Sequence, residues 1–402
     1  MPPAGGSEVA RCTTSLMCRT VPSLSLGSTM AEGSAPRPTG SVRFVEQPPS
    51  PARTPWDAGH DGPPFDVCAV IVVFGEEPWL ERAVRAVLAS TGVSVQVVLV
   101  ENGGSEPTIA ELELLDRVSV VRPYRNTGFA EGCNLGVAAS TTPIIALINP
   151  DAIAEPQALA ALAEVARRPD VGIASGSLRL ASAPDRMNSA GNDISFLGLS
   201  WAGRFNEPAS SFPDEFDIAS ASGAAMACTR ELWNSLGGLE ESFFAYFEDT
   251  EFSIRCWQSG LRVVFVPDAV VVHRYEFSRN VEKFFLLERN RLVTTLTCFD
   301  TRHLIGIAPL LLFMELALIG LAAKDHWLPQ KFRAYRSVIG NRHVLRRRRN
   351  SVMQARTASP RRFGDLLTTH LSPGNLPGAR PPAFVERGLA IYWRILRRIA
   401  RI

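Results

Sequence analysis

A run of five apolar residues, Ile144–Ile148, leads directly into Asn149, Pro150 and Asp151. Such a run is typical of a strand buried on both faces of a parallel sheet. Polar side chains just beyond the carboxyl end of such a strand lie where open α/β sheets bind their ligands. The oxygens of Asn149 and Asp151 suit Mg²⁺ or Mn²⁺ carrying a diphosphate. The alternative is an ordinary turn in which Asp151 caps the next helix.

Similar apolar runs recur between residues 67 and 175 and alternate with segments of helical spacing. Buried strands are predicted at Val67–Phe74, Val95–Val100, Val118–Val121, Ile144–Ile148 and Val171–Ser175. After the first of them, one helix face is predicted from Leu80, Ala83, Val84, Val87 and Leu88. This alternation predicts an α/β fold with a mostly parallel sheet and helices on both faces.

The pattern weakens from residue 176 to residue 216, which favours an insertion that shapes a substrate site over a separate domain. Small residues from Ala219 to Thr229 then predict a pair of strands, and a helix follows from about Glu248 to Gln258. Two more strands and a long helix are predicted at Arg262–Pro267, Ala269–His273 and Val281–Cys298.

The first 66 residues are rich in Pro, Gly, Ser and Ala and lack the continuous apolar segment of a secretory signal. We expect a disordered segment here, with Met30 as an alternative start. The chain has seven cysteines, an odd number without zinc-ligand spacing. They predict buried free thiols in a reducing cytoplasm.

Residues Leu304–Ala323 are strongly apolar and long enough to span a bilayer, but Glu315 lies among them. A central Glu costs a few kcal/mol in a bilayer, so spanning, interfacial and packed helices all stay open. From Lys324 onward there are 18 Lys or Arg against 3 Asp or Glu. This excess, with the run Arg346–Arg349, predicts contact with an anionic membrane surface. No nucleic-acid partner is expected, because the tail lacks interleaved aromatics and a recognisable module.

Carboxylates gather at the predicted helix start Phe247-Glu248-Asp249-Thr250-Glu251. They can simply complement the helix dipole, but a carboxylate beside aromatics can also act as a general base on a sugar hydroxyl. Adjacent helical residues point about 100° apart, so Glu248 and Asp249 cannot share one role. His273, at the end of an apolar strand, is a candidate metal ligand only if the fold brings it beside Asp151.

A loop rich in Gly and Asn, Arg125–Asn134, runs into a predicted helix. Its glycines allow backbone N–H groups to approach a phosphate or sugar, and the helix start favours anions. The loop matches neither the dinucleotide fingerprint nor the P-loop, so alone it is a weak signal.

Taken together, these motifs resemble the family 2 glycosyltransferases with the GT-A fold, in particular the bacterial rhamnosyltransferase and galactofuranosyltransferase branch. Seven stretches match in the family's order over roughly Val67 to Phe299. They are Val70–Phe74, Val98–Gly103, Asn126–Gly136, Asn149–Asp151, Gly223–Met226, Phe247–Arg255 and Val272–His273.

The resemblance implies a role for each matched position. Asp249 corresponds to the general base, with Glu248 supporting the acceptor side. Positions implied to bind the donor are Glu101, Asn126, Gly128, Asn134 and Asn149. Metal ligands implied for Mn²⁺ or Mg²⁺ are Asp151 and His273. The implied reaction is an inverting displacement without a covalent intermediate.

The implied partners are a nucleotide-sugar donor and a glycan or lipid-linked acceptor in cell-envelope polysaccharide synthesis. Rhamnose from a dTDP donor is the first expectation and galactofuranose from UDP the second. We expect a cytoplasmic enzyme associated with the inner face of the cell membrane. The predicted layout is a disordered segment (1–66), a GT-A domain (67–300), an apolar membrane-associated helix (301–325) and a basic tail (326–402).

Two positions depart from the family pattern. Gly75 stands where Asn or Asp is common after the first strand, and Glu101 stands where Asp is usual. One alternative is therefore a non-catalytic relative that binds a sugar nucleotide or glycan. A second is a sugar-phosphate nucleotidyltransferase, but the chain lacks the Gly- and Lys/Arg-rich loop that would hold a triphosphate.

Overall fold

The computed structural model describes residues 66–104, 106–274, 281–371 and 382–402. The expected disordered segment, Met30, Cys12 and Cys18 lie outside the described residues. Among the described residues the main sheet has ten strands, and its central order is β10-β12-β6-β11-β4-β1-β2-β3. Strand β5 (Ala152–Ala154) also pairs with β12, and β7 (Ala183–Ser189) with β6.

The strands of the main path begin and end as follows: β1 Val67–Val73, β2 Val95–Glu101, β3 Val118–Val121, β4 Ile144–Ile148, β6 Val171–Leu180, β10 Phe216–Asp217, β11 Ala225–Thr229 and β12 Arg262–His273. Strands β3, β2, β1 and β4 pair in parallel, as do β6 and β12. Strand β11 runs antiparallel between β4 and β6. The sheet is therefore mixed but mostly parallel, which confirms the predicted α/β class.

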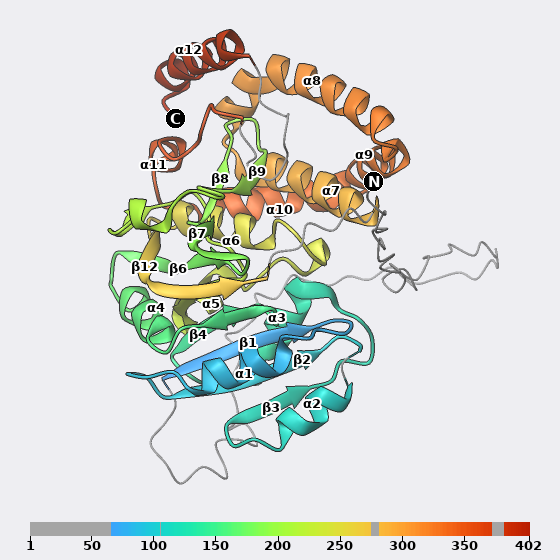
Figure 1. Ribbon diagram of the computed structural model, residues 1–402. Coiled ribbons are helices and arrows are strands. Elements are labelled where there is room, and N and C mark those ends of the chain that lie inside the picture. The colour runs from blue at the N-terminus through green and yellow to red at the C-terminus, as the bar shows by residue number, and fades with distance from the viewer. Residues whose placement is uncertain (1–65, 105, 275–280, 372–381) are drawn as a thin grey trace, which may run out of the picture. The chain divides into compact units, whose positions relative to one another are not determined.

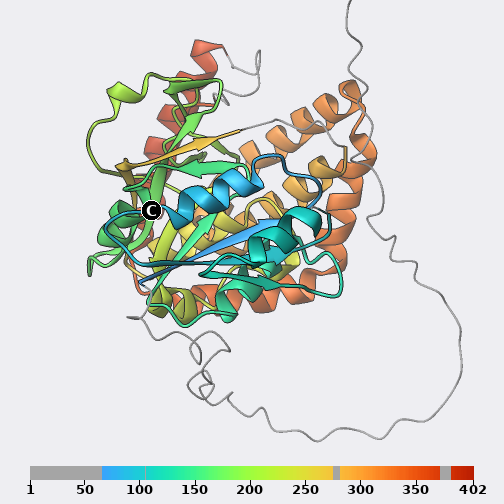
Figure 2. The same cartoon turned by 60° about the horizontal axis from the view of Figure 1, so that its bottom comes forward.

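Alternate residues of one strand supply two separate cores. In β1, Val70 and Val72 pack in the core that contains α3 (Gly128–Ala138), α5 (Arg230–Leu236) and α6 (Glu248–Gln258). Ile71 and Val73 pack on the other face with α1 (Leu80–Leu88), α2 (Glu106–Glu113) and α4 (Ala158–Ala166). Successive side chains of a strand point to opposite faces, so continuous apolar runs become strands covered on both sides. Figure 2 shows α1, in light blue, lying over the strands of the sheet.

Two predicted elements differ from the structure. The expected strand pair is the single strand β11, because a turn at Ser222–Ala225 takes the preceding residues out of the sheet. The two strands expected around Pro267 and Asp268 are one strand, β12, with a bulge between Val266 and Val270. A bulge tolerates a proline because its N–H is not needed for pairing. The insertion forms β7, the hairpin β8 (Asn192–Ile194) and β9 (Ser200–Ala202), and a short 3₁₀ turn.

Among the residues described after the sheet there are six helices (Figure 1): α7 Val281–Cys298, α8 Thr301–Lys324, α9 Leu328–Gly340, α10 Arg342–Ala355, α11 Pro360–Gly364 and α12 Ala383–Ala400. Helix α7 confirms the predicted long helix. By length and composition alone, α8 is the one helix among the described residues that could cross a membrane.

Glu315 of α8 is held in a cluster of charges shared with α7 and α9. Its carboxylate lies 2.6 Å from Arg291 Nη2 and 2.7 Å from Lys331 Nζ. The Tyr335 hydroxyl donates to it at 2.6 Å, and Glu288 pairs with the same two cations. Burial alone would raise the pKa of Glu315, but the neighbouring cations lower it overall. The residue that looked incompatible with an apolar helix is thus paired inside the protein.

Part of the basic tail is used internally. Arg348 of α10 pairs with Glu240 and, at 2.5 Å, with Glu251, whose side chain is fully buried in α6. Arg349 donates to the carbonyl oxygen of Phe299 at 2.8 Å. The expectation that the run Arg346–Arg349 serves an anionic surface therefore holds at most for Arg346 and Arg347, which are exposed.

All five described cysteines are free and buried: Cys68, Cys133, Cys228, Cys256 and Cys298. Burial raises the pKa of Cys68 to about 11 and that of Cys228 to about 12. A thiol with such a pKa is protonated and unreactive at neutral pH. Within the described residues, these thiols serve as packing groups.

Candidate active site

The end of β12 brings His273 beside Asp151. Strand β5 begins one residue after Asp151 and pairs antiparallel with β12, so that Ala152 lies opposite His273. His273 Nε2 then lies 3.2 Å from Asp151 Oδ1 and 3.5 Å from Asn149 Nδ2. Residues 122 positions apart in the chain thus meet at the carboxyl edge of the sheet.

Asn188 of β7 fixes the imidazole from the other side. Its Oδ1 lies 2.8 Å from His273 Nδ1, and both residues are buried. With the Nδ1 proton donated to Asn188, the Nε2 lone pair faces Asp151. A second hydrogen bond of this type is what orients metal-binding histidines in proteins.

The donor set fits a hard divalent cation. Two adjacent ligands of an octahedral ion, each at 2.0–2.1 Å, are about 3.0 Å apart, close to the 3.2 Å observed here. Among the described residues there is no cluster of three His, Cys, Asp or Glu side chains that could hold a metal. Two protein ligands suit Mg²⁺ or Mn²⁺, whose remaining positions are commonly filled by substrate phosphates and water.

A dipeptide on the turn before β11 connects this pair to α6. The carbonyl oxygen of Ala224 accepts a hydrogen bond from Asn149 N at 3.0 Å. The neighbouring Gly223 N–H donates to Asp249 Oδ2, also at 3.0 Å. The candidate metal ligands and the candidate base therefore lie on two sides of one short turn.

Three acids of the first turn of α6 have different environments. Glu251 is fully buried and paired with Arg255 and Arg348. Glu248 is buried, and its Oε2 has no hydrogen-bond partner among the described residues. Burial and the charge of Asp249 raise the pKa of Glu248 to about 8.

Asp249 is half-buried and outside these ion pairs. Its Oδ1 accepts from Thr250 N at 2.6 Å, and its Oδ2 accepts from Gly223 N. Burial raises its pKa, while the hydrogen bonds lower it in part. Of the three acids, Asp249 is the one with an accessible carboxylate whose proton affinity is increased, as a general base requires.

The segment that leads into α6 is strained. Phe244, Tyr246 and Phe247 have φ angles of 64°, 71° and 71°, which bulky residues rarely adopt. The buried Asn290 of α7 donates to the carbonyl oxygens of Phe243, Ala245 and Tyr246 at 2.7–3.0 Å. Backbone strain of this kind persists only where the surrounding structure imposes it, and it is common at active sites.

The start of α3 meets this aromatic segment. Gly128 has a φ of 76°, and a Cβ there would overlap the carbonyl oxygen of Phe244. That oxygen accepts from the N–H groups of Phe129 and Ala130 at 2.6 and 3.1 Å. Asn126 Oδ1 accepts from Gly128 N at 2.8 Å. The loop expected to approach a phosphate thus approaches the segment before α6.

Asn102, after β2, and Asn134, at the end of the loop, both bind protein groups. Asn102 holds the loop to the end of β2: its Nδ2 donates to Gly128 O and its Oδ1 accepts from Thr127. Asn134, expected in the donor pocket, donates to Leu239 O at 2.9 Å and accepts from Leu239 N at 3.0 Å. Its observed hydrogen bonds are therefore structural.

The ends of β1 and β2 meet at two glycines. Gly75 has a φ of 74°, a left-handed conformation that Gly, Asn and Asp tolerate best. A Cβ on Gly104 would lie 2.7 Å from Gly75 Cα. Glu101, the last residue of β2, lies 3.3 Å from Arg122 Nε, and burial together with Glu106 raises its pKa. Glu101, which is one methylene longer than the Asp usual at this position, is thus held by Arg122 at this edge of the sheet.

Asn188, Asn102 and Asn290 hold site groups but are absent from the predicted set. Asn102 was quoted in a motif without a role, and the other two lie outside every motif. A buried asparagine between elements leaves no periodic signal in the sequence, so only the fold identifies it.

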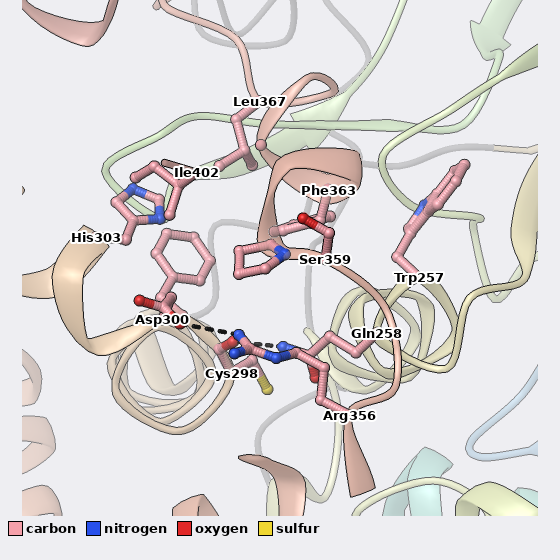
Figure 3. Close-up of a pocket in the computed structure, with 13 residues that line it drawn as sticks. Trp257, Gln258, Cys298, Asp300, His303, Arg356, Ser359, Phe363, Leu367 and Ile402 are labelled. Atoms are coloured by element: carbon pink, nitrogen blue, oxygen red, sulfur yellow. Dashed lines mark hydrogen bonds and ion pairs between the residues drawn. The ribbon is translucent and has the colours of Figure 1, made fainter. Parts of the chain in front are cut away.

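A small pocket elsewhere in the described residues is too narrow for a substrate (Figure 3). It lies between the end of α6, the corner between α7 and α8, and α11, where Arg356 pairs with Asp300 at 3.0 Å. Its volume of about 20 Å³ holds a single water molecule at most. None of the predicted site residues lines it.

Comparison with known proteins decides the family. Residues 63–293, more than half of the chain, match the model of the family described as Glycosyltransferase like family 2. The chain belongs to this family. It is therefore a glycosyltransferase, and its mostly parallel, two-sided sheet is the GT-A arrangement expected for this glycosyltransferase family.

Curated relatives of this glycosyltransferase are distant. The N-acetylglucosaminyl-diphospho-decaprenol L-rhamnosyltransferase of Mycobacterium tuberculosis is 25% identical over 235 residues, which are 52% of this chain and 76% of the relative. An uncharacterised protein of Sinorhizobium fredii is 28% identical over 218 residues, 50% of this chain. This glycosyltransferase spans only 24% of that second relative. A mannosyltransferase structure from Pyrobaculum calidifontis, solved with GDP-Man and Mn²⁺, is 16% identical over 84% of this chain and 86% of that one, with a TM-score of 0.44.

Proposed function

We propose that the chain is an inverting, metal-dependent glycosyltransferase that moves a rhamnose-like or galactofuranose-like sugar from a nucleoside diphosphate to a glycan or lipid-linked acceptor. The observation that carries the proposal is the turn at Gly223-Ala224. It joins Asp249 to the edge where Asp151 and His273 face each other. A base and a cation site on two sides of one turn suit displacement at an anomeric carbon between them.

In the proposed reaction, Asp249 takes the proton of the acceptor hydroxyl as its oxygen attacks the anomeric carbon. The bond from that carbon to the diphosphate breaks, and the nucleoside diphosphate leaves with the bonding electrons. Asp151 and His273 would hold the divalent cation, which supplies charge neutralisation for the departing diphosphate. The raised proton affinity of Asp249 favours removal of the proton at neutral pH.

Glu101, Asn126 and Gly128 are proposed to shape the donor side. Glu101 would read the nucleobase and ribose, and its contact with Arg122 sets where its carboxylate lies. Asn149 and Asn134 complete the proposed donor set, although Asn134 would act only by holding the residues after 238 against α3. Glu248 would support the acceptor side.

The relative named as a rhamnosyltransferase acts, by its name, on an N-acetylglucosaminyl-diphospho-decaprenol. We therefore propose cell-envelope polysaccharide synthesis as the process, on the cytoplasmic side of the membrane. A lipid-linked diphosphate sugar is the first acceptor to offer, with dTDP-rhamnose and then UDP-galactofuranose as donors.

The test is a donor screen with the full chain and Mg²⁺ or Mn²⁺, in which released nucleoside diphosphate is recorded with and without a membrane-lipid extract. We expect metal-dependent release from one donor, increased by the extract. Asp249→Asn should lower the rate by 10²–10⁴-fold, with donor binding retained. The exposed Asp268→Asn is the matched control and should leave the rate unchanged.

Other results would redirect the assignment. Donor binding without release in every combination would favour the binding-only relative. Release of pyrophosphate from a nucleoside triphosphate and a sugar phosphate would favour the nucleotidyltransferase. Full activity of Asp249→Asn would remove the proposed base.

A further inference from the structure

The solvent-facing side of α8 is apolar along its length. The exposed residues between positions 305 and 321 recur at helical spacing and are Ile305, Ala308, Pro309, Leu312, Phe313, Leu316, Ala317, Gly320 and Leu321. Phe313 is 72% exposed and Leu312 is 65% exposed. A helix that faces water normally carries polar and charged residues on its outer side. This stripe is therefore suited to an apolar environment.

Two polar side chains of α8, His303 and Glu315, face the protein instead, and the exposed polar residues Thr301, Arg302 and Lys324 lie at the two ends of the helix. His303 is buried and lies 2.9 Å from the carbonyl oxygen of Phe196. Glu315 is paired with Arg291 and Lys331 from two other helices. A spanning helix needs lipid or other spanning segments around it, whereas this one rests on charged, water-compatible helices. Lipid can thus reach one side of α8 only.

Helix α12 carries a second apolar line with arginines beside it. Phe384, Ile391, Ile395 and Ile399 are exposed and share one face at about 3.6 residues per turn. The exposed Arg387, Arg394 and Arg398 form the adjacent line. Apolar residues flanked by cations are the signature of a helix that lies in the plane of a membrane surface.

The two helices contact each other (Figure 1, upper part). The Tyr392 hydroxyl donates to Gly306 O, and a Cβ on Gly306 would overlap Leu396. The rings of His303 and Trp393 are 4.9 Å apart. Helices α8 and α12 are thus held against each other, and we call the stripe of α8 together with the two lines of α12 the docking surface.

We propose that the docking surface binds an anionic lipid bilayer, with α8 and α12 lying in the interface and neither of them crossing it. The arginine line of α12 favours a lipid bilayer as the partner, because anionic phosphate headgroups attract arginines. A second copy of the chain would instead bring two arginine lines together, and these would repel each other. The inference deepens the proposed function by naming how the chain reaches a lipid-linked acceptor. Binding to lipid itself needs neither donor nor acceptor, so it is testable even if sugar transfer is not found.

The experiment is co-sedimentation of the full chain with vesicles of phosphatidylcholine, or of phosphatidylcholine mixed with phosphatidylglycerol. We expect binding to the anionic vesicles, weakened by salt. The double variant Leu312→Ser/Phe313→Ser should reduce binding at least tenfold, since it removes exposed apolar groups without disturbing the core. Arg394→Gln/Arg398→Gln should reduce binding to anionic vesicles roughly tenfold and remove most of the salt dependence.

Matched controls use exposed residues elsewhere. Leu114→Ser changes an exposed leucine far along the chain from both helices, and Arg82→Gln/Arg85→Gln removes the same charge from α1. Both controls should bind as the wild type does. Equal losses in controls and test variants, or wild-type binding by the test variants, would overturn the proposal. Association of the chain with itself that Phe313→Ser abolishes, without vesicle binding, would identify a contact between copies instead.

Treatment of membranes with alkaline carbonate distinguishes a helix α8 that lies in the membrane interface from one that spans the bilayer. Chain bound to cell membranes should be released by alkaline carbonate, as expected for a protein that only lies on the surface. Retention after carbonate treatment, together with protection of α8 from protease in sealed vesicles, would show that α8 spans and would overturn the interfacial arrangement.

Discussion

The Nδ1 atom of His273 lies 2.8 Å from Asn188 Oδ1, and this contact decides which imidazole nitrogen faces Asp151. Partners of this type commonly change metal affinity by 10- to 100-fold when removed. We expect Asn188→Ala to raise the Mn²⁺ concentration needed for half-maximal activity by that factor. Mn²⁺ binding in the presence of a nucleoside diphosphate, followed calorimetrically, gives a second readout. The exposed Asn234→Ala should match the wild type in both, and an unchanged metal requirement in Asn188→Ala would contradict the assignment.

Glu248 makes the stability of the protein depend on pH. Its pKa is about 8 in the folded chain against 4.5 as the ordinary value, so the folded state holds a proton that the unfolded state releases in between. Stability therefore falls as the pH rises from about 4.5 to about 8. Glu248→Gln keeps the shape without the charge, so it should be more stable than the wild type by up to about 5 kcal/mol at pH 8 and nearly equal to it near pH 4.5.

Urea unfolding of both proteins at acidic and basic pH measures this difference. Glu231→Gln, an exposed first-turn glutamate of α5, is the control and should show no pH-dependent gap. A gap between Glu248→Gln and the wild type that is the same at both pH values would contradict the raised pKa.

Gly128 and Gly237 offer a matched pair of substitutions. Both have a φ of 76°, so an alanine at either position is strained by roughly 1–2 kcal/mol. Only at Gly128 would the added Cβ also collide with Phe244, whereas at Gly237 nothing lies within 4 Å. We expect Gly128→Ala to cost clearly more stability than Gly237→Ala and to lower kcat as well. Equal effects in unfolding and in rate assays would show that the contact with Phe244 is unimportant.

Asn290 is a positioning residue for the segment before α6. Asn290→Ala would remove the side-chain donor shared by three backbone carbonyls, which we expect to cost roughly 2–4 kcal/mol of unfolding free energy. Of the three, the carbonyl oxygen of Phe243 keeps Arg289 and the N–H of Ala245 as donors. Because Asp249 follows this segment directly, kcat should fall while donor affinity stays near the wild-type value. The exposed Asn350→Ala serves as control. A loss confined to stability, with kcat unchanged in the folded fraction, would show a purely structural role.

The buried charge cluster makes a further prediction. Glu315→Ala leaves Arg291 and Lys331 partly unpaired in the interior, which typically costs 3–5 kcal/mol. The exposed Glu111→Ala should change stability little. Denaturant unfolding checks both, and a near-neutral Glu315→Ala would indicate that Glu288 alone satisfies the two cations.

Local patterns predicted the sheet because continuous apolar runs have few alternatives to a strand buried on both faces. The sequence predicted His273 as a metal ligand on the condition that the fold brings it beside Asp151. That condition is plausible from the sequence, since the ends of strands on one edge of a sheet lie close together whatever their separation in the chain. Asn188 was not predicted, because it lies in an insertion whose sequence has no clear period. The left-handed Phe244 and Tyr246 also leave no signal, since the conformation is imposed by contacts from α3 and α7.

For the apolar segment around Glu315, too, the sequence predicted one part of the structure and only the fold showed the rest. The sequence gives its length and apolar composition directly. Whether the helix spans a membrane, lies in the membrane interface or packs on the protein depended on which residues neutralise Glu315. Those partners lie 24 positions before and 16 positions after it, on separate helices. Pairing across three helices is a property of the fold and leaves no spacing rule in the sequence.

The contact of Arg348 with Glu251 sets a limit on how far the chain can be shortened. Glu251 lies two residues after Asp249 and has no exposure to water, so its charge depends on Arg255 and Arg348 for compensation. A protein truncated before α10 would keep every matched family motif but lose Arg348. Glu251, in the first turn of α6, would then be paired with Arg255 alone. Crystallisation trials and expression of the minimal catalytic domain should therefore retain the chain at least through Ala355, the last residue of α10.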